Sequence, residues 1–258
     1  MTGGIKTAPA TGTAPTQLAP VLELEEVSKV YPGQPPVRAL DGVSLRVCAG
    51  ELTAILGPSG SGKSTLLRLL LGLERPESGS VFYDGRDLAD LDLREVRQQI
   101  GVVLQTSRVL PGSILENIVG ASGRSEEEAW EAARLAGLDE EIAQMPMRMS
   151  TLVMEGGSGL SGGQQQRLQI ARAIARKPRL LFLDEATSAL DNRTQAIVTG
   201  FLKTLRATRI VVAHRLSTIR DADRILVMKG GVIVEEGCFE ELAARKGMFA
   251  ELAARQLQ

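Results

Sequence analysis

Aromatic residues are scarce in this sequence: they make up 3% of its 258 residues, so aliphatic side chains must build most of the hydrophobic core. Long apolar runs are missing as well. The richest stretch, Leu66 to Leu73, is interrupted by Arg68, whereas a membrane-spanning helix needs about 18 or more consecutive apolar residues. The formal net charge is only −1, whereas nucleic-acid-binding domains carry a basic excess. We therefore expect a globular chain that does not cross a bilayer itself and has no nucleic-acid partner.

Cysteine and histidine are also rare: the chain has two cysteines and one histidine. Cys48 and Cys238 are far apart and fit neither a metal-binding nor a redox motif, so we expect two small buried residues in a reducing cytosol and no disulfide. His214 follows the apolar run 210–213, which places it at the predicted carboxyl end of a strand. A lone histidine is more often structural, but one in this position could reach a phosphate group and the water that attacks it.

The chain divides into a tail and one folded unit. Residues 1–20 are mostly Thr, Gly, Ala and Pro, a composition that cannot bury a core, so we expect a flexible linker or tail. The folded unit is expected to span 21–258, with a helical subdomain of about 110–176. Capping boxes, in which a helix-starting Ser is followed three residues later by Glu or Gln, occur at Ser125–Glu128 and Ser161–Gln164.

Two kinds of strand pattern follow the tail. Apolar residues alternate in segments 22–27 and 43–47, which is typical of half-exposed antiparallel strands. Continuous apolar runs at 100–104, 180–183 and 210–213 are typical of strands that are buried on both faces of a parallel sheet. The sequence therefore predicts an α/β fold with a mixed core sheet, an antiparallel β part and a helical subdomain.

A phosphate-loop pattern follows the short apolar run 52–56. Its residues are Gly57, Pro58, Ser59, Gly60, Ser61, Gly62, Lys63 and Ser64, and Thr65 comes next. The glycines let backbone N–H groups converge on phosphate oxygens, Lys63 neutralises the β- and γ-phosphate charge, and the Ser64 hydroxyl is a ligand for Mg²⁺. A helix that begins inside the loop adds a favourable dipole for an anion. We expect these residues, including Thr65, to bind a nucleotide.

Two carboxylates end the buried run 180–183. Ligands of open α/β sheets bind at the carboxyl ends of strands, so Asp184 and Glu185 should face the phosphate loop. Asp184 would hold Mg²⁺, and Glu185, one residue further and aimed differently, suits the general base for the attacking water. Taken alone, the pair could equally be acidic residues at a helix N-terminus. The neighbouring phosphate loop favours the functional interpretation.

Three weaker signals complete the predicted site. The string Ser161, Gly162, Gly163, Gln164 opens a helix and leaves free N–H groups at its positive end, which is a second anion-binding feature or, by itself, a plain N-cap. Gln105 ends an apolar run and can offer an amide oxygen to Mg²⁺, although a glutamine after a strand is usually solvated. Tyr31 offers a ring that could stack on adenine, or else cover the edge of a sheet.

Together these motifs resemble ABC ATPases from Val21 to Gln258. The resemblance implies that Tyr31 is the A-loop aromatic, that Gln105 is the Q-loop residue and that Gly57 to Ser64 form the Walker A loop. It further implies an ABC signature, a Walker B strand with its catalytic base, a D-loop and a switch histidine, which correspond to Leu160 to Gln164, Leu180 to Glu185, Ser188 to Asp191, and His214. The implied ligands are ATP and Mg²⁺. None of these positions departs from the family pattern.

One chain carries one phosphate loop and one signature. If the signature helix caps the γ-phosphate from the far side, it must come from a second copy, so we expect a two-fold symmetric dimer with two ATP molecules between the copies. Asp191, in the D-loop, is expected to contribute to the nucleotide site of this dimer.

Two further segments narrow the resemblance. Residues 110–118 resemble the segment after the Q-loop of ABC exporters, and 151–156 resemble the exporter X-loop. Stretches 101–120 and 145–194 look most similar to bacteriocin or peptide exporters associated with nitrile-hydratase-like leader peptides. Such ATPases are usually fused behind a transmembrane domain, so we expect a separate subunit, an excised fragment or a truncated product. It would lie at the cytoplasmic face of the membrane through a transmembrane partner or fused domain.

Three biological roles are to be compared. The first is the ATPase of a membrane exporter. The second is a soluble ABC ATPase of DNA repair, translation or Fe–S assembly, against which stand the missing basic patch, coiled-coil insertion, cysteine cluster and second cassette. The third, a regulatory module without activity, conflicts with the presence of Lys63, Asp184, Glu185 and His214.

Overall fold

The computed structural model describes residues 20–187, 189–213 and 219–256. Residues 1–19 of the predicted tail, Ser188 and His214 lie outside the described residues, and β1 already begins at Pro20. The strands are β1 (Pro20–Tyr31), β2 (Val37–Cys48), β3 (Leu52–Leu56), β4 (Ser78–Tyr83), β5 (Arg86–Asp87), β6 (Ile100–Val103), β7 (Gly112–Ser113), β8 (Leu152–Val153), β9 (Leu180–Asp184), β10 (Thr208–Val212), β11 (Arg224–Lys229) and β12 (Val232–Gly237). The α-helices are α1 (Lys63–Leu70), α2 (Leu93–Gln98), α3 (Ile114–Val119), α4 (Glu126–Leu135), α5 (Asp139–Gln144), α6 (Gly162–Ile174), α7 (Asn192–Thr204), α9 (Phe239–Ala244) and α10 (Met248–Gln256).

The largest sheet has the strand order β12-β11-β3-β10-β9-β6. Strands β11, β3, β10, β9 and β6 pair in parallel, whereas β12 at the edge is antiparallel. The continuous apolar runs thus form buried parallel strands as predicted; all five residues of β9 are buried. Parallel pairing places the carboxyl ends of β3, β9 and β10 at one edge, where the phosphate loop begins.

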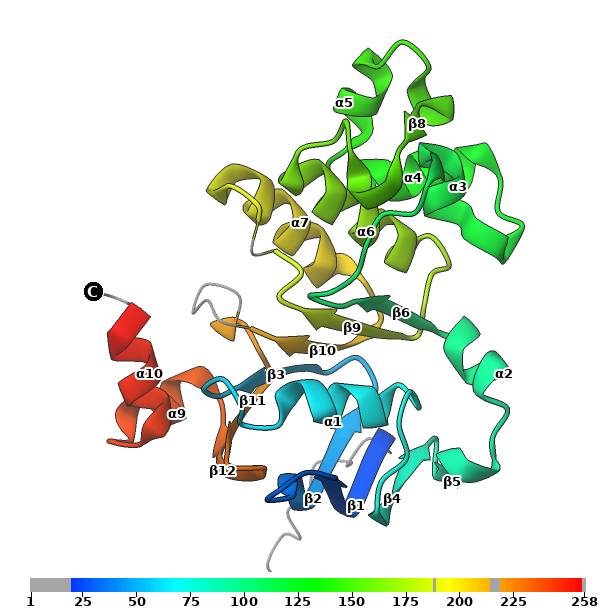
Figure 1. Ribbon diagram of the computed structural model, residues 1–258. Coiled ribbons are helices and arrows are strands. Elements are labelled where there is room, and N and C mark those ends of the chain that lie inside the picture. The colour runs from blue at the N-terminus through cyan, green and yellow to red at the C-terminus, as the bar shows by residue number, and fades with distance from the viewer. Residues whose placement is uncertain (1–19, 188, 214–218, 257–258) are drawn as a thin grey trace, which may run out of the picture.

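The second sheet is antiparallel, with the order β2-β1-β4-β5. Leu22 pairs with Val47, Leu24 with Leu45, and Val27 with Val43, so the alternating residues of the two segments face one another as their pattern predicts. These side chains are buried because helix α1 lies between this sheet and the parallel one (Figure 1). The mixed α/β fold predicted from the sequence is therefore confirmed.

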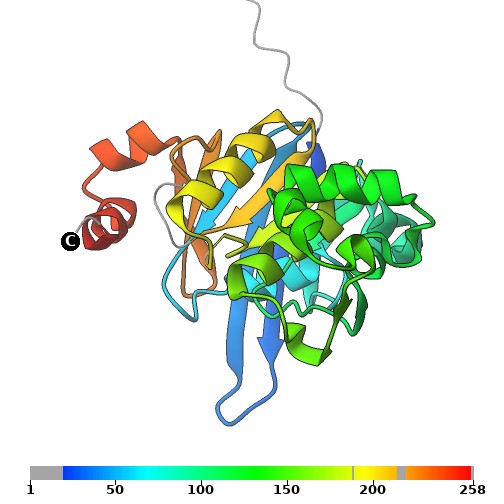
Figure 2. The same cartoon turned by 90° about the horizontal axis from the view of Figure 1, so that it is seen from above.

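The hydrophobic core has two parts, one on each face of the parallel sheet. One part joins the apolar side chains of α1 to both sheets. The other joins the opposite face of the parallel sheet to helices α3, α4, α6, α7, α9 and α10. Seen from above, α4 to α6 (green) and the pair α9 and α10 (red) lie at opposite ends of the molecule (Figure 2). Among the described residues no helix has the length and apolar character to span a membrane.

Segment 110–176 contains α3 to α6 and the two short strands β7 and β8, which pair with each other and were not predicted. Both predicted capping boxes are present, at the starts of α4 and α6. The limits of the helical subdomain stay a prediction. Cys48 and Cys238 form no disulfide, as expected, but both are half-buried rather than buried. Each lies at the end of an element near the surface, beyond the packed apolar residues.

Gly101 of β6 allows α6 to approach the parallel sheet. A methyl group at this buried glycine would lie 2.9 Å from Leu181 Cδ1 and from Pro178 Cγ, and closer still to the carbonyl oxygen of Ala173. Gly200, within α7, is exposed and would meet nothing within 4 Å. The same Gly→Ala change should therefore have opposite effects at the two positions.

We predict that Gly101→Ala lowers the free energy of unfolding by about 1–3 kcal/mol, the usual cost of overpacking. Gly200→Ala should raise it by about 0.5–1 kcal/mol, because alanine is the better helix former. Urea denaturation of both variants measures the difference. A Gly101→Ala variant as stable as the parent protein would show that β6 and α6 are not in close contact.

Candidate functional site

The phosphate loop connects β3 to α1 and is shaped by its glycines. Gly62, the residue before α1, has φ +102°, and a Cβ atom there would lie 2.9 Å from Leu40 Cδ2 and closer to the Ala39 carbonyl oxygen. Only glycine adopts this conformation without strain. The first N–H groups of α1 therefore emerge into the same space as the loop, with no side chain capping them.

Lys63 lies at the centre of the loop and is buried. Its ammonium group donates to Gly57 O at 2.8 Å, to Pro58 O at 2.9 Å and to Ser61 Oγ at 3.3 Å. Burial lowers the pKa of Lys63, while the nearby charges of Asp184 and Glu185 oppose that shift. The ammonium group thus has neutral oxygen partners that phosphate oxygens could replace.

The two carboxylates at the end of β9 differ in burial and in backbone conformation. Asp184 completes the strand and is buried. Glu185 has φ +51°, in the left-handed region, where a residue other than glycine is strained by about 1–3 kcal/mol. Its backbone N–H donates to Val212 O at 3.0 Å, and Gln105 Nε2 donates to Glu185 Oε2 at 3.3 Å. The left-handed turn therefore brings the side chain of Glu185 to Gln105.

These residues line a pocket with a volume of about 400 Å³, which lies in the range of small-molecule sites, about 300–1,000 Å³. The predicted site residues that line it are Tyr31, Ser59, Gly60, Ser61, Gly62, Lys63, Ser64, Thr65, Gln105, Asp184 and Glu185. Gly57 and Pro58 contribute carbonyl oxygens to Lys63 instead. Residues at the ends of β1 and β9, in the phosphate loop and just after β6 are far apart in the sequence and thus meet at one edge of the parallel sheet.

Tyr31 ends β1 and is held in place at the pocket. Its hydroxyl donates to Glu74 Oε2 at 2.6 Å, and Lys29 Nζ lies 5.6 Å from the ring centroid. Burial alone would raise the pKa of Glu74, but the bonds and charges of Tyr31, Lys29 and Arg68 bring it below its ordinary value. An ionised Glu74 therefore fixes the hydroxyl end, while the ring remains part of the pocket wall.

Four further residues line the pocket that sequence reasoning missed: Val37, Arg38, Ala39 and Val212. The first three belong to the start of β2. Gly231, in the turn between β11 and β12, connects β2 to the phosphate loop, because its carbonyl oxygen accepts from Asp41 N at 3.0 Å and its N–H donates to Ser61 O at 3.1 Å. No motif marks this contact. Its one sequence signal is indirect, since the small residues Ala39, Gly62 and Gly231 permit the close approach.

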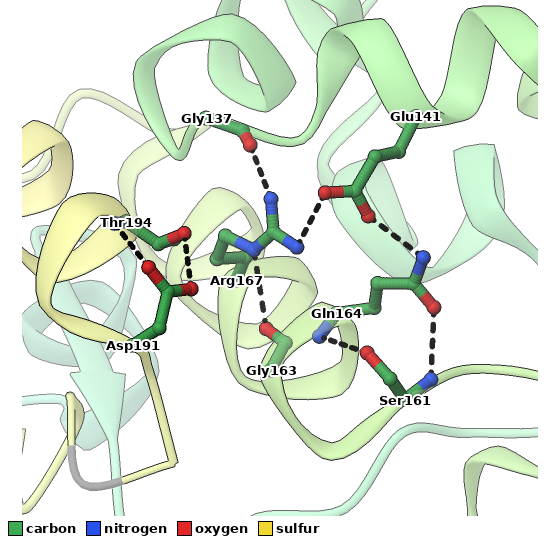
Figure 3. Close-up of polar contacts among 8 residues, drawn as sticks. All are labelled: Gly137, Glu141, Ser161, Gly163, Gln164, Arg167, Asp191 and Thr194. Atoms are coloured by element: carbon green, nitrogen blue, oxygen red, sulfur yellow. Dashed lines mark hydrogen bonds and ion pairs between the residues drawn. The ribbon is translucent and has the colours of Figure 1, made fainter.

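The signature residues Ser161, Gly162, Gly163 and Gln164 do not line this pocket. In the capping box of α6, Ser161 Oγ accepts from Gln164 N at 3.2 Å and Gln164 Oε1 accepts from Ser161 N at 2.8 Å (Figure 3). Methyl groups built at Gly162 would meet nothing within 4 Å, and at Gly163 nothing closer than 3.6 Å. Nothing within the described chain therefore requires glycine at these two positions.

Glu141 of α5 anchors the start of α6 and was also missed. Its Oε1 accepts from Arg167 Nη2 at 2.7 Å and its Oε2 accepts from Gln164 Nε2 at 2.7 Å (Figure 3). Arg167 is buried and also bonds the carbonyl oxygens of Gly137 and Gly163. A buried guanidinium needs such partners, so Arg167 in the sequence is a signal that a carboxylate lies nearby.

Asp191 does not line the pocket either. It is the N-cap of α7: its carboxylate accepts from Thr194 N and Thr194 Oγ1 (Figure 3) and also from Arg193 N. The hydrogen bonds from Thr194 lower its pKa. Within the described chain Asp191 therefore acts on its own helix.

The pocket offers hard oxygen donors: the Ser64 hydroxyl, the Gln105 amide oxygen and the Asp184 carboxylate. No cluster of three or more His, Cys, Asp or Glu side chains suited to a metal occurs in the described part of the chain. Mg²⁺ is usually held by one or two carboxylates together with phosphate oxygens and water. The donor set therefore fits Mg²⁺ bound with a nucleotide.

Comparisons with known proteins agree with this geometry. The sequence profile of the family described as "ABC transporter" matches residues 40–188. The chain is 45% identical over 248 residues to mouse "ATP-binding cassette sub-family B member 5", covering 95% of this chain and 20% of that protein. It is 46% identical over 239 residues to the "cyclolysin secretion/processing ATP-binding protein CyaB" of Bordetella pertussis, covering 91% of this chain and 33% of that protein.

A solved structure is similar throughout. "A bacterial Atm1-family ABC exporter with ATP bound" superposes with a TM-score of 0.88 at 38% identity, covering 96% of this chain and 44% of that one. The chain thus spans between a fifth and a half of the length of these proteins.

We predict that Glu141→Ala lowers the free energy of unfolding by about 1–3 kcal/mol, because Arg167 loses its charged partner. Glu140→Ala is the matched control: Glu140 is the preceding residue of α5 and is exposed, so its removal should change stability by less than about 0.5 kcal/mol. Urea denaturation compares them. Equal free energies of unfolding for the two variants would contradict the role of Glu141 in holding the start of α6.

Proposed function

The chain belongs to the ABC transporter family of ATP-binding domains, and from this premise we propose that it hydrolyses ATP as one of two paired copies that power transport across a membrane. One observation carries the proposal: a buried lysine within the phosphate loop and two carboxylates, Asp184 and Glu185, line the same pocket at the carboxyl edge of the parallel sheet. This combination binds a nucleotide and supplies a base next to its phosphates.

ATP lies in the pocket with adenine on the Tyr31 ring and its phosphates in the loop. The Lys63 ammonium exchanges its carbonyl partners for β- and γ-phosphate oxygens. The free N–H groups of α1 and the loop from Ser59 to Thr65 surround the remaining oxygens. Fixed donors of this kind stabilise negative charge without reorganising during the reaction.

Mg²⁺ would be held by Ser64, Gln105 and Asp184, and when bound it neutralises phosphate charge. Glu185 accepts the proton of the attacking water as general base, and Gln105, which contacts Glu185 in the structure, positions that carboxylate. His214 is proposed to contact the γ-phosphate and the same water; it lies outside the described residues.

The site is completed by a second copy of the chain. Ser161, Gly162, Gly163 and Gln164 lie outside the pocket of their own chain, and the two glycines have no steric role there. Gly162 and Gly163 have no side chains that would cover the N-terminus of α6 beside the capping box, which suits a phosphate group approached from a second surface. In an isologous dimer each signature would cap the ATP of the other copy, with Asp191 near the same contact.

A transmembrane partner is proposed to bind beside the Q-loop. Leu110, Leu152 and Met154 are exposed by 60%, 65% and 65% and belong to or flank the β7–β8 pair. Exposed apolar side chains grouped in this way are typical of protein contacts. The chain would then act at the cytoplasmic face of the cell membrane, as part of an exporter.

Peptides or bacteriocins are the proposed cargo, because segments 101–120 and 145–194 look similar to exporters of such molecules. A soluble ABC ATPase is not favoured, because the relatives are named as transport proteins.

We predict that Glu185→Gln lowers the ATP turnover rate by roughly 10²–10⁴, the scale of a general base, while nucleotide binding persists. Phosphate release and equilibrium binding of ATP measure the two effects. Glu240→Gln, the same exchange at an exposed position of α9, should turn over ATP at the parent rate. Near-normal turnover of Glu185→Gln would exclude Glu185 as the base.

A mixing experiment tests the shared site. Lys63→Ala and Ser161→Arg should each be nearly inactive alone. In a 1:1 mixture, half of randomly paired dimers are mixed, and each mixed dimer has one site with neither defect, so up to about a quarter of the parent activity should return. The ATPase rate is measured against mixing ratio at fixed total protein. A fully active Ser161→Arg homodimer would contradict the shared site outright.

A further inference from the structure

Gln166, on the first turns of α6, bridges both ends of the segment that follows β9. Its Nε2 donates to the carbonyl oxygen of Glu185 at 3.1 Å, and its Oε1 accepts from the backbone N–H of Ala189 at 2.9 Å. The side chain is half-buried. One amide therefore uses its donor and its acceptor to hold two backbone groups that belong to the catalytic segment rather than to its own helix.

The backbone of Glu185 needs this support. The residue is in the left-handed conformation, and such a conformation persists in a residue other than glycine only where its surroundings hold it. Val212 O holds the N–H of Glu185 at 3.0 Å from one side, and Gln166 holds its carbonyl from the other. If the carbonyl were released, the peptide could rotate and the side chain would leave Gln105.

We infer that Gln166 is a positioning residue for the hydrolytic reaction: it fixes the peptide of Glu185 so that the carboxylate points into the pocket. The inference rests on the proposed function, in which Glu185 is the general base. Gln166 does not line the pocket itself, so it acts through the backbone that it holds, and the peptide of Glu185 is the part of that backbone that carries the proposed base.

The position of Gln166 on α6 has a second implication. The same helix begins with Ser161 and Gly162, which are proposed to cap the ATP of the other copy. Gln166 lies one turn further along and holds the base of its own copy. Helix α6 therefore carries, one turn apart, the proposed cap for the ATP of the other copy and the residue that holds the base of its own copy.

The test is a double-mutant cycle between Gln166→Met and Glu185→Gln in the full chain. Methionine has a similar length but neither the donor nor the acceptor of glutamine. Gln166→Met should lower kcat roughly 10- to 100-fold, the scale on which small misplacements affect reactions, with the KM for ATP changed by less than about twofold. Because Gln166 acts through Glu185, adding Gln166→Met to Glu185→Gln should lower the residual rate no further.

Gln165→Met is the matched control. Gln165 is the neighbouring residue of α6, and its Nε2 also donates to two backbone carbonyls, that of Gly157 before the signature and that of Leu160, the first signature residue. Gln165→Met should lower kcat by the same factor in the parent chain and in the Glu185→Gln variant, because Gln165 bonds the backbone around the signature and not the backbone of Glu185. Only Gln166→Met should lose its effect when the carboxylate is absent.

A second variant of Gln166 keeps the test valid if Gln166→Met does not fold. Gln166→Glu keeps an acceptor for Ala189 N but cannot donate to Glu185 O, so it should reproduce the loss of kcat; it carries the test if Gln166→Met fails to fold by urea denaturation. A Gln166 variant with the parent kcat, or one that lowers the residual rate of Glu185→Gln by its full factor, would overturn the inference while leaving the proposed function intact. A parent chain without ATPase activity would overturn both.

Discussion

Parallel pairing of buried strands is the constraint on which the site depends. Because β3, β10 and β9 run in the same direction, the phosphate loop, Val212 and the acidic pair Asp184 and Glu185 all emerge at one edge. The pairing is enforced by apolar side chains on both faces, since α1 covers one face and the helices of the larger core cover the other. The sheet therefore brings the phosphate loop and the carboxylates to the same edge, and the hydrogen bonds of Lys63 and of Gly231 N to the loop fix its shape there.

Helix α6 connects the elements that surround this edge. Its polar side chains at successive turns bond different segments: Gln166 bonds Glu185 and Ala189, Gln169 Nε2 donates to Ser107 O at 3.0 Å, and Arg172 Nε donates to Asn117 O at 2.7 Å. The helix thus holds the segment after β9, the stretch after Gln105 and helix α3 with one face. A helix that carried apolar residues there would pack as well, but it would leave these backbone groups without partners.

The sequence predicts most of the framework because its patterns reflect local physics. Continuous apolar runs identify the parallel strands, and Ser161 with Gln164 identifies the start of α6. What escapes prediction depends on distant partners: the left-handed conformation of Glu185 is unusual for its type and is supported by Gln166 and Val212. The start of β2 forms one wall of the pocket, and its position depends on how the β1–β2 hairpin packs against the rest of the chain. Strands β7 and β8 have too few residues to show a hydrophobic periodicity. The prediction that Cys48 and Cys238 are buried was wrong, because the rarity and apolar character of cysteine do not indicate where along an element the residue lies.

The fold of the single chain does not explain why glycine occupies positions 162 and 163, where there is space for larger side chains. The described chain would accommodate larger residues at both positions, so the stability of the single chain does not require glycine there. Gly62 and Gly101 differ, since there a side chain would collide with the protein itself. Gly62 and Gly101 are therefore required by the fold of the single chain, whereas Gly162 and Gly163, like Gly200, are not; at the start of α6 the proposed second copy would supply the requirement for glycine.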